Sequence, residues 1–503
     1  MTFVAPTEDI LFSLRHVAGA GSVDGWDDDL ADSILNHFGQ FAAGVIAPLN
    51  AVGDRQGARL VNGRVRMPDG FGAAYAELAA GGWQGLTLPE AHGGMGASPL
   101  VAAGVSEIFS GANHAMQMVC NLVPGAAAVL LRDGTAAQQA EWLPKLAKGA
   151  ALSTMCLTEP AAGSDLSAIR CKAVPKGPAW QITGEKIFIS GGDQDMSDTI
   201  LHLVLARSGG AGLGGLSLFA CPRQSAVTVT RIEDKMGLHA SPTCQMTFDA
   251  AKAELIGAEG DGLRVMFTLM NHARIDVALQ GVAHASHAAR IARNYALDRV
   301  QGRLPDKSPA RLHLHADVAR MLDRQDRLAL GARAMCHVTL VELERGKRPA
   351  LVDFLTPLCK IAGSQAGVES ADLGIQVLGG YGYLREYGLE QIWRDARICA
   401  IYEGANGIHE RTLATRALRP GGGSADFADL IGELAGHDRA SMARLADWKN
   451  RADRMRHAED ALAQAHAFAQ DTVTLFFDAV WTRIAAVADK HPQPERIKGL
   501  ALA

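Results

Sequence analysis

A stretch of almost forty residues without a proline, residues 262–300, limits most strongly what this chain can fold into. It reads GLRVMFTLMNHARIDVALQGVAHASHAARIARNYALDRV, which predicts one long helix. Further helices are predicted over 310–345, 357–378 and 407–418, with Pro357 near the first position of its helix. Together they predict a bundle of long helices in the C-terminal half of the chain.

The middle of the chain has a different sequence pattern, one that is typical of strands. AWQITGEKIFIS predicts a hairpin that turns at residues 183–186, and four more segments of strand length follow it: DTILHLVLARS, GLSLFACP, AVTVTRI and CQMTFDAA. Residues 27–149 have helical spacing instead, with one of Asp27 to Asp29, and Thr135, as candidate N-caps. The chain is therefore predicted to be mainly α with an inserted β domain.

Four segments follow from this order of elements. We predict an N-terminal helical domain at 1–151, whose first 26 residues are an extension, and a β domain at 152–258. A C-terminal helical bundle at 259–420 and a short helical extension at 425–503 complete the chain. The GGGS run at 421–424 is interpreted as a linker between the last two.

Composition narrows the class of function. A net charge of -5 gives no reason to expect nucleic acid as a partner, and no apolar run reaches membrane-spanning length. Glu8 and Asp9 stand where a secretion signal would be basic and apolar. The eight cysteines form no C-x-x-C pair. His284 and His287 could share a helix face, but the chain has no H-E-x-x-H motif and these histidines have no obvious carboxylate partner. We expect a soluble cytoplasmic protein without a metal site.

One motif invites a wrong interpretation. Residues 210–215 match G-x-G-x-x-G, but a dinucleotide site needs these glycines to open a helix. Here LSLFACP follows, which is typical of a strand, so we interpret the glycines as a connection between strands.

Four stretches carry a family resemblance: CLTEPAAGSDLSAI (156–169), KIFISGG (186–192), QVLGGYGY (376–383) and IYEG (401–404). In this order and spacing they resemble the acyl-CoA dehydrogenase superfamily, over about residues 27–420. The sequences of three segments are most similar to its 3-methylmercaptopropionyl-CoA dehydrogenase-like and FadE-type branch: KIFIS, KMGLHASPTC and LMNHARIDVALQG. The resemblance implies an acyl-CoA dehydrogenase-like fold: an N-terminal helical domain, a middle β-barrel or sheet domain and a C-terminal four-helix bundle.

The reaction of this family explains the residue types. Taking hydrogens from Cα and Cβ of an acyl-CoA thioester needs a base and a hydride acceptor, and side chains cannot accept hydride, so a flavin must do so. The resemblance implies that this flavin is FAD. The resemblance makes Glu403 the base for the α-proton, with the β-hydride passing to flavin N5, and lets Gly404 bring the chain close to the substrate. No Lys or Arg lies within 400–408, and burial should raise the pKa of Glu403. Some relatives place the base before an arginine, at the position of Ala273, which cannot act as one.

The resemblance also implies cofactor contacts within one subunit. Thr158 would donate to the pyrimidine edge of the flavin, helped by main-chain groups near Leu157. Ser164 would contact the pyrophosphate or the CoA arm of the substrate. Phe188 stands where relatives have Trp or Tyr beside the flavin, and Ser190 replaces the usual Thr near N5.

Other contacts are implied across a subunit interface. Arg299 matches the arginine that reaches the pyrophosphate of the neighbouring FAD, and the main-chain cradle on its adenine side is matched by three residues: Gln376, Gly379 and Gly380. A homodimer or a dimer of dimers follows from these matches. Arg274, and more weakly Asn271, resemble residues that contact CoA at the mouth of the site.

Other functions stay open at this point. Electrons would pass to an electron-transfer flavoprotein, but an acyl-CoA oxidase that uses O₂ has the same motifs. A non-redox or DNA-associated flavoprotein of the superfamily predicts a basic tail, whereas residues 421–503 hold ten Lys and Arg against twelve Asp and Glu. Two features depart from the family: Ala405 replaces a frequent Thr, and the tail is shorter than this branch usually has.

Overall fold

The computed structural model describes residues 2–436 and 438–502, with the main chain alone at 267–270. The chain forms two compact units. The first, called the helical unit, comprises Met1–Ala43, Pro99–Gly111 and Asn271–Ala503, and the second, called the β unit, comprises Gly44–Ser98 and Ala112–Met270. This grouping follows packing rather than chain order, so the domain boundaries given above stay predictions. The predicted fold class, mainly helical with an inserted β domain, is confirmed.

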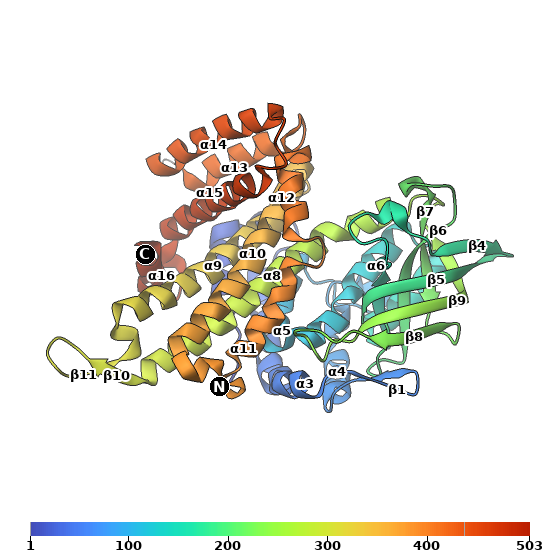
Figure 1. Cartoon of the computed structure of the whole chain (residues 1–503), viewed down its shortest axis with the longest axis horizontal. Coiled ribbons are helices and arrows are strands. Elements are labelled where there is room, and N and C mark those ends of the chain that lie inside the picture. Colours follow the sequence, from blue (N-terminus) through green and yellow to red (C-terminus); the bar gives the residue numbers. More distant parts are fainter. Residues whose placement is uncertain (1, 437, 503) are drawn as a thin grey trace. The chain divides into compact units, whose positions relative to one another are not determined.

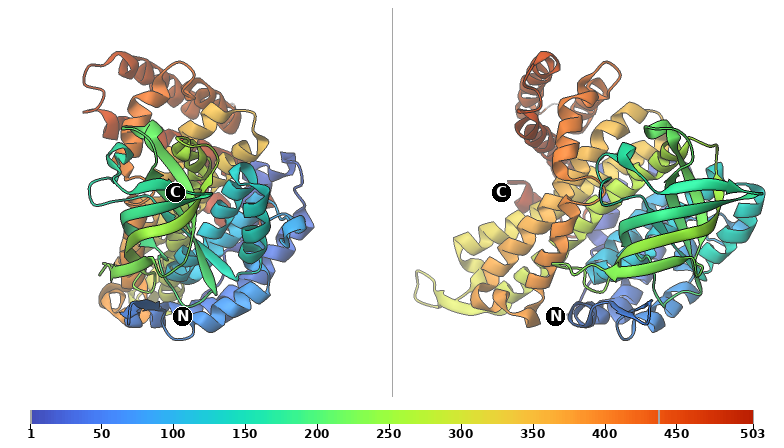
Figure 2. Two further views of the ribbon diagram at one scale, coloured as in Figure 1. Left: turned by 90° about the vertical axis from the view of Figure 1, so that its right-hand side faces the viewer. Right: turned by 45° about the vertical axis from the view of Figure 1, so that its right-hand side comes forward.

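The β unit is built on a seven-stranded sheet, whose strands Figure 2 shows in one curved layer. The pairing order is β3-β6-β4-β5-β9-β7, β8 pairs with β9, and an additional β6–β7 pairing closes the ring. All pairs are antiparallel except β3 with β6 and β4 with β6. The bounds are β3 Ala151–Cys156, β4 Lys172–Lys176, β5 Ala179–Ser190, β6 Thr199–Arg207, β7 Leu216–Pro222, β8 Val227–Ile232 and β9 Thr243–Ile256.

Short helices complete the β unit. They are α3 Asn50–Gln56, α4 Phe71–Ala80, α6 Leu122–Asp133 and α7 Ala136–Ala147, with a hairpin of β1 Arg59–Val61 and β2 Arg64–Arg66. Thr135 caps α7 in a capping box with Gln138, as its position in the sequence predicted. Two helices pass from one unit to the other along the chain: α5 Pro99–Cys120, which breaks at Asn113, and α8 Gly262–Asp298.

The helical unit contains the long helices that the sequence predicted (Figure 1). Its helices besides α5 and α8 are α1 Thr7–Phe12, α2 Asp28–Phe41, α9 Ala316–Arg345, α10 Pro349–Leu378, α11 Leu389–Ala396, α12 Asn406–Ala414, α13 Ser424–Ala435, α14 Arg439–His457, α15 Ala465–Ala486 and α16 Pro494–Leu502. A small hairpin joins α8 to α9, made of β10 Val300–Arg303 and β11 Pro309–Arg311. Of the predicted candidates Asp27 to Asp29, it is Asp27 that caps α2, because its side chain accepts from the N–H of Leu30.

Helices α8 and α10 touch through their main chains. A Cβ on Gly281 would lie 2.1 Å from the carbonyl oxygen of Gly363, and one on Gly363 would lie 2.3 Å from that of Ala278. Gly367 likewise has no room, since its Cβ would lie 2.7 Å from the carbonyl oxygen of Gly281. We call these four residues the glycine seam. Only glycine permits this approach, so the seam fixes the spacing of the two helices.

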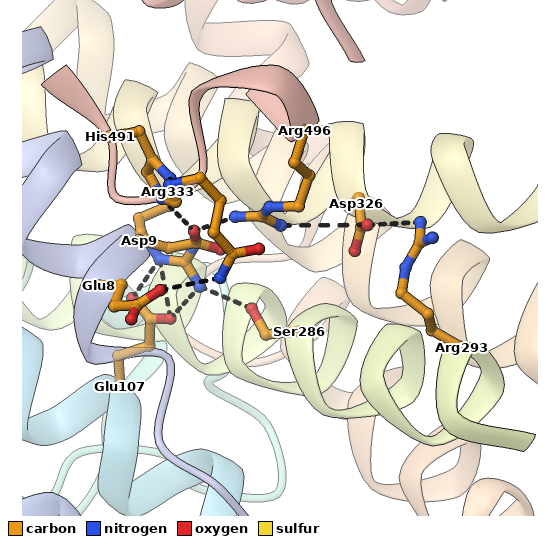
Figure 3. Close-up of polar contacts among 10 residues, drawn as sticks. Glu8, Asp9, Glu107, Ser286, Arg293, Asp326, Arg333, His491 and Arg496 are labelled. Carbon is orange, nitrogen blue, oxygen red and sulfur yellow. Dashed lines mark hydrogen bonds and ion pairs between the residues drawn. The ribbon is translucent and has the colours of Figure 1, made fainter. Parts of the chain in front are cut away.

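Buried charges join distant segments of the helical unit, as Figure 3 shows. Arg333 of α9 is fully buried, and its guanidinium bonds the Glu107 carboxylate of α5 at 2.6 to 3.1 Å. It also donates to Ser286 Oγ at 2.6 Å. Asp9 of α1 lies 3.7 Å from the same guanidinium and accepts from His491 Nε2 at 2.9 Å. We call these five residues the Arg333 cluster.

Three local predictions were wrong. AWQITGEKIFIS is one continuous strand, β5, and not a hairpin: Gly184 (φ +148°) lies at a register shift, while the chain turns at Gly177 (φ +60°). The GGGS run is no loose linker, because a Cβ on Gly423 would lie 2.1 Å from the carbonyl oxygen of Ala350. Pro357 lies inside α10, which begins at Pro349. The glycines at 210–215, by contrast, lie between strands β6 and β7 as predicted.

In the part of the chain that the structure describes, no single helix is long and apolar enough to cross a membrane. The bent pair of α5 and α6 meets the length and composition requirement only when both are taken together.

Candidate active site

The predicted site residues fall in both units. In the β unit, Leu157 and Thr158 follow directly after β3. The carbonyl oxygen of Thr158 accepts from the N–H of Ile187 at 2.9 Å, which places this segment beside β5. The structure therefore brings Leu157 and Thr158 next to the strand that carries Phe188 and Ser190.

A buried ion pair holds this arrangement. Lys186 Nζ lies 2.8 Å from Glu159 Oε1 and donates to the carbonyl oxygen of Leu157 at 2.9 Å. Both side chains are buried, Lys186 completely. Glu159 also accepts from the N–H groups of Arg170 and Cys171, at 2.7 and 3.0 Å. One carboxylate thus ties the turn after β3 to β5.

Lys186 and Glu159 were not predicted as functional residues, although they lie within the segments KIFISGG and CLTEPAAGSDLSAI. Ile182 and Lys186 are both buried on β5, so a lysine occupies an inward position of the strand. A buried lysine requires a partner. Residues 183–186 were predicted to form a turn, so the inward position of Lys186 could not be recognised from the sequence.

Phe188 combines an unusual backbone with an unusual environment. Its φ is +58°, in the left-handed region, and 59% of the residue is exposed. It lies between Lys186 and Ile189, where the pairing of β5 with β9 shifts register. Left-handed backbone costs of order 1–3 kcal/mol for such a residue, and strain of this kind gathers at functional sites. Ser190, two residues on, is half-buried, whereas Ser164 is exposed in the turn after β3.

In the helical unit, Glu403 lies in the loop that precedes α12. Its φ is +52°, and Gly404 follows at +95°, so two successive residues have left-handed backbone. The carbonyl oxygen of Glu403 accepts from His409 Nε2 at 3.3 Å. Burial lowers the pKa of His409 to about 3, so its ring is neutral, with the proton on Nε2. A Cβ on Gly404 would lie 2.8 Å from that nitrogen, which leaves room for glycine alone.

The residue before Glu403 is also fixed. The Tyr402 hydroxyl donates to Gln280 Oε1, and Gln280 Nε2 donates to Asp276 Oδ2 at 2.9 Å. Asp276 in turn accepts from the hydroxyl of Ser106 at 2.5 Å. A chain of polar contacts from α5 and α8 therefore supports the loop that carries Glu403.

Burial raises the pKa of the Glu403 carboxyl above its ordinary value. The charges of Arg274 and Lys360 oppose this rise, and that of Asp276 adds to it. Residues 400–408 contain no Lys or Arg, but two cations from other segments act on Glu403 in the folded chain, one from α8 and one from α10. Arg274 is itself half-buried, and burial lowers its pKa. Asn271 donates to Asp353 Oδ1 at 3.0 Å.

A cavity of about 440 Å³ lies at the end of α10. Arg299, Gly379 and Gly380 line it, so the structure brings together three of the four residues predicted to bind the neighbouring cofactor. The Arg299 guanidinium lies over the ring of Tyr381, 5.8 Å from its centroid. Gln376 is exposed on the last turn of α10 and is not among the lining residues. Within residues 2–436 and 438–502, no group of three or more His, Cys, Asp or Glu side chains could hold a metal ion.

The fold has two helical regions with a closed and mostly antiparallel sheet domain between them in the chain. Models of the N-terminal, middle and C-terminal domains of acyl-CoA dehydrogenase match residues 31–150, 154–251 and 260–418. The chain therefore belongs to the acyl-CoA dehydrogenase family and is an acyl-CoA dehydrogenase.

Two relatives and one solved structure show the extent of the likeness. The chain is 40% identical to 3-methylmercaptopropionyl-CoA dehydrogenase of Ruegeria pomeroyi, over 87% of this chain and 80% of that one. It is 34% identical to the broad-specificity linear acyl-CoA dehydrogenase FadE5 of Mycobacterium tuberculosis, over 82% and 74%. The fold matches the structure titled "Bd2924 apo-form" with a TM-score of 0.79 at 20% identity, over 95% and 96%. The predicted family and branch are confirmed.

Proposed function

We propose that this chain catalyses the FAD-dependent α,β-dehydrogenation of an acyl-CoA thioester to the trans-2-enoyl-CoA. The observation that carries the proposal is Glu403: a carboxyl whose pKa is raised by burial, on a left-handed turn that His409 and Gly404 hold in one shape. A base works best when its pKa lies near the working pH, which burial favours here.

In this proposal Glu403 takes the α-proton of the thioester. The main-chain N–H of Glu403 donates to the thioester oxygen, where negative charge develops as the proton leaves. Gly404 has no side chain to obstruct the approach of the substrate. FAD, when bound, supplies the acceptor for the β-hydride.

The residues of the β unit suit a flavin. The exposed ring of Phe188 offers an aromatic face at a strained position, and Ser190 keeps a hydroxyl on the same strand. Leu157 and Thr158, fixed beside that strand by Lys186, would donate to the pyrimidine edge of the ring. Ser164 would contact the pyrophosphate or the CoA arm, because its side chain is exposed in the turn that follows.

The cavity at the end of α10 suits a dinucleotide from a second copy of the chain. Arg299 would bind the pyrophosphate, and the main chain of Gly379 and Gly380, with Gln376, would receive the adenine side. Large apolar side chains are exposed nearby in the sequence, which supports burial against a partner: Val300, Leu314, Tyr383 and Leu384. The active form is then a homodimer or a dimer of dimers.

The substrate is an acyl-CoA. Arg274 and Asn271 would contact its CoA moiety, together with Ser164. The relatives named above suggest a short or linear chain, with a methylthio substituent as one option. Electrons would leave through an electron-transfer flavoprotein.

Anaerobic titration of the FAD-loaded protein tests the proposal. Butyryl-, hexanoyl-, octanoyl- and 3-methylmercaptopropionyl-CoA are added in turn, and the absorbance of the oxidised flavin is followed. Wild type is compared with Glu403→Gln and with Glu495→Gln, which removes a carboxylate that is 86% exposed on α16. We expect bleaching in wild type and Glu495→Gln, and its loss in Glu403→Gln. Bleaching that survives in Glu403→Gln would remove Glu403 as the base, and no bleaching with any acyl-CoA would overturn the reaction itself.

A further inference from the structure

Lys360 is a fully buried lysine in the middle of α10. Its Nζ donates to Oδ1 of Asn406 at 3.0 Å. Among the residues that the structure describes, no carboxylate lies at ion-pair distance from this ammonium, so its partner is a neutral amide. Lysine is almost never buried completely unless a partner compensates for its lost hydration. A side chain placed at such a cost invites a functional explanation.

The amide that Lys360 holds belongs to the loop of the proposed base. Asn406 is the first residue of α12 and lies three positions after Glu403. Its Nδ2 donates to Ser364 Oγ at 3.1 Å. Lys360 and Ser364 are four residues apart, on the same face of α10, so one helix holds both ends of the amide.

The loop is then held on both sides of its left-handed turn. Tyr402 is bonded to Gln280 before Glu403, and Asn406 is bonded to Lys360 after it. His409 fixes the carbonyl oxygen of Glu403 between these two points. A misplacement of about 1 Å can cost a catalytic group roughly a hundredfold in rate, so an anchor of this kind matters for a base.

Lys360 also acts on Glu403 through its charge. Burial raises the pKa of Glu403, and Arg274 and Lys360 lower it again. Burial lowers the pKa of Lys360 to about 8, with Cys399 and Glu403 opposing this shift and Arg274 adding to it. Among the described residues, the groups that act on the pair are Arg274 and Asp276 of α8, Cys399 of η12 (Arg397–Ala400), Tyr402 of the loop and His409 of α12.

We propose that Lys360 is a positioning residue for the base: its ammonium anchors the Glu403 loop through Asn406, and its charge favours the ionised carboxylate. This inference rests on the proposed function, because it gives Lys360 a role only through Glu403. The two effects are separable, since Asn406 carries the anchor and the ammonium alone carries the charge.

Three variants separate them. Lys360→Met removes the anchor and the charge, Asn406→Ala removes the anchor alone, and Lys360→Arg keeps both a donor and a charge. Lys347→Met, at an exposed position just before α10, is the matched control. Circular dichroism first establishes that each variant is folded.

The first readout follows the pH dependence of flavin bleaching in stopped flow. We expect Lys360→Met and Asn406→Ala to slow the limiting rate by roughly tenfold to a hundredfold. In Lys360→Met the apparent pKa of the profile should also rise, because a cation that favours carboxylate is gone. In Asn406→Ala that apparent pKa should stay near the wild-type value, and Lys360→Arg should restore it. A slower rate with an unchanged profile in Lys360→Met would overturn the electrostatic part of the proposal.

The second readout needs no turnover and no cofactor. The difference in melting temperature between Glu403→Gln and its parent is measured from pH 4 to 9. Because the pKa of Glu403 is raised in the folded protein, its ionisation destabilises the fold, so the parent loses stability against Glu403→Gln as pH rises through the folded pKa. In the Lys360→Met background this loss should extend to higher pH and become larger. If this melting-temperature difference has the same pH dependence with and without the substitution Lys360→Met, the proposal is refuted. Shifted curves together with no bleaching would instead retain the Lys360–Glu403 coupling and reject the proposed reaction.

Discussion

The ion pair between Glu107 and Arg333 offers the sharpest test of what holds the helical unit together. We consider Glu107→Leu, Arg333→Met and the double variant. Both side chains are fully buried, and the guanidinium bonds the carboxylate through two nitrogens. Removing one member of a buried pair typically costs about 3–5 kcal/mol, because the other charge stays behind unpaired. Replacing both with apolar side chains of similar size is often neutral, so the double variant should lie within about 1 kcal/mol of wild type.

The two single variants should differ in their pH dependence. In Glu107→Leu the guanidinium cannot lose its proton, and Asp9 at 3.7 Å compensates it only in part, so the cost should be constant between pH 5 and 8. In Arg333→Met the remaining carboxyl can take up a proton. Burial already raises the pKa of Glu107 against the opposing pull of Arg333, and without that pull the pKa rises further. A raised folded pKa stabilises the protein at low pH, so Arg333→Met should regain stability as pH falls.

Native-state hydrogen exchange of α9 peptides, read by mass spectrometry, gives the opening free energy of this region. The single costs should sum to roughly 6–10 kcal/mol, far above the cost of the double variant. Costs that add in the double variant, or single costs below about 1 kcal/mol, would refute the view that this pair is an ionised, mutually compensating contact.

Three further variants test the units separately. Lys186→Met leaves Glu159 buried without its cation, so the free energy of unfolding of the β unit in urea should fall by about 3–5 kcal/mol. This variant should also release FAD on gel filtration. Lys176→Met, at an exposed position, should change neither the stability nor FAD binding. Gly363→Ala places a methyl 2.3 Å from a carbonyl oxygen and should cost about 1–3 kcal/mol or more, seen as a lower melting temperature, whereas Gly499→Ala has open space and should not destabilise. Gly404→Ala, at φ +95° and 2.8 Å from His409, should slow flavin bleaching roughly a hundredfold; an unchanged rate would mean that the turn tolerates a side chain.

The sequence predicted those parts of the fold that have a local pattern. The proline-free stretch at 262–300 became α8, and Thr135 and Asp27 cap helices because capping depends on neighbours in the chain. Glu403 was found through its motif and not through its environment. The raised pKa that was expected for it does appear, although through burial in a place where two cations act on it.

Features that depend on packing could not be predicted in the same way. A GGGS run has the composition of a flexible linker, yet Gly423 is needed because the chain passes against Ala350 of α10. Pro357 breaks an isolated helix, but burial on both sides of it keeps α10 continuous. Lys360 can be recognised in the sequence as unusual, because it is a single lysine in the apolar run PLCKIA. Its partner, 46 positions away, depends on the tertiary fold.

The glycine seam between α8 and α10 has a consequence for how the site keeps its shape. Contacts between side chains can rearrange by changing rotamers, but Gly281, Gly363 and Gly367 meet main chain directly and have no rotamers to change. Gln280 of α8 and Lys360 of α10, which hold the two ends of the Glu403 loop, stand within three residues of this seam. The two helices that anchor the Glu403 loop are therefore held at a fixed distance from each other. Warming, or a change of acyl chain, can alter the side chains around the base while the distance between its two supports stays the same.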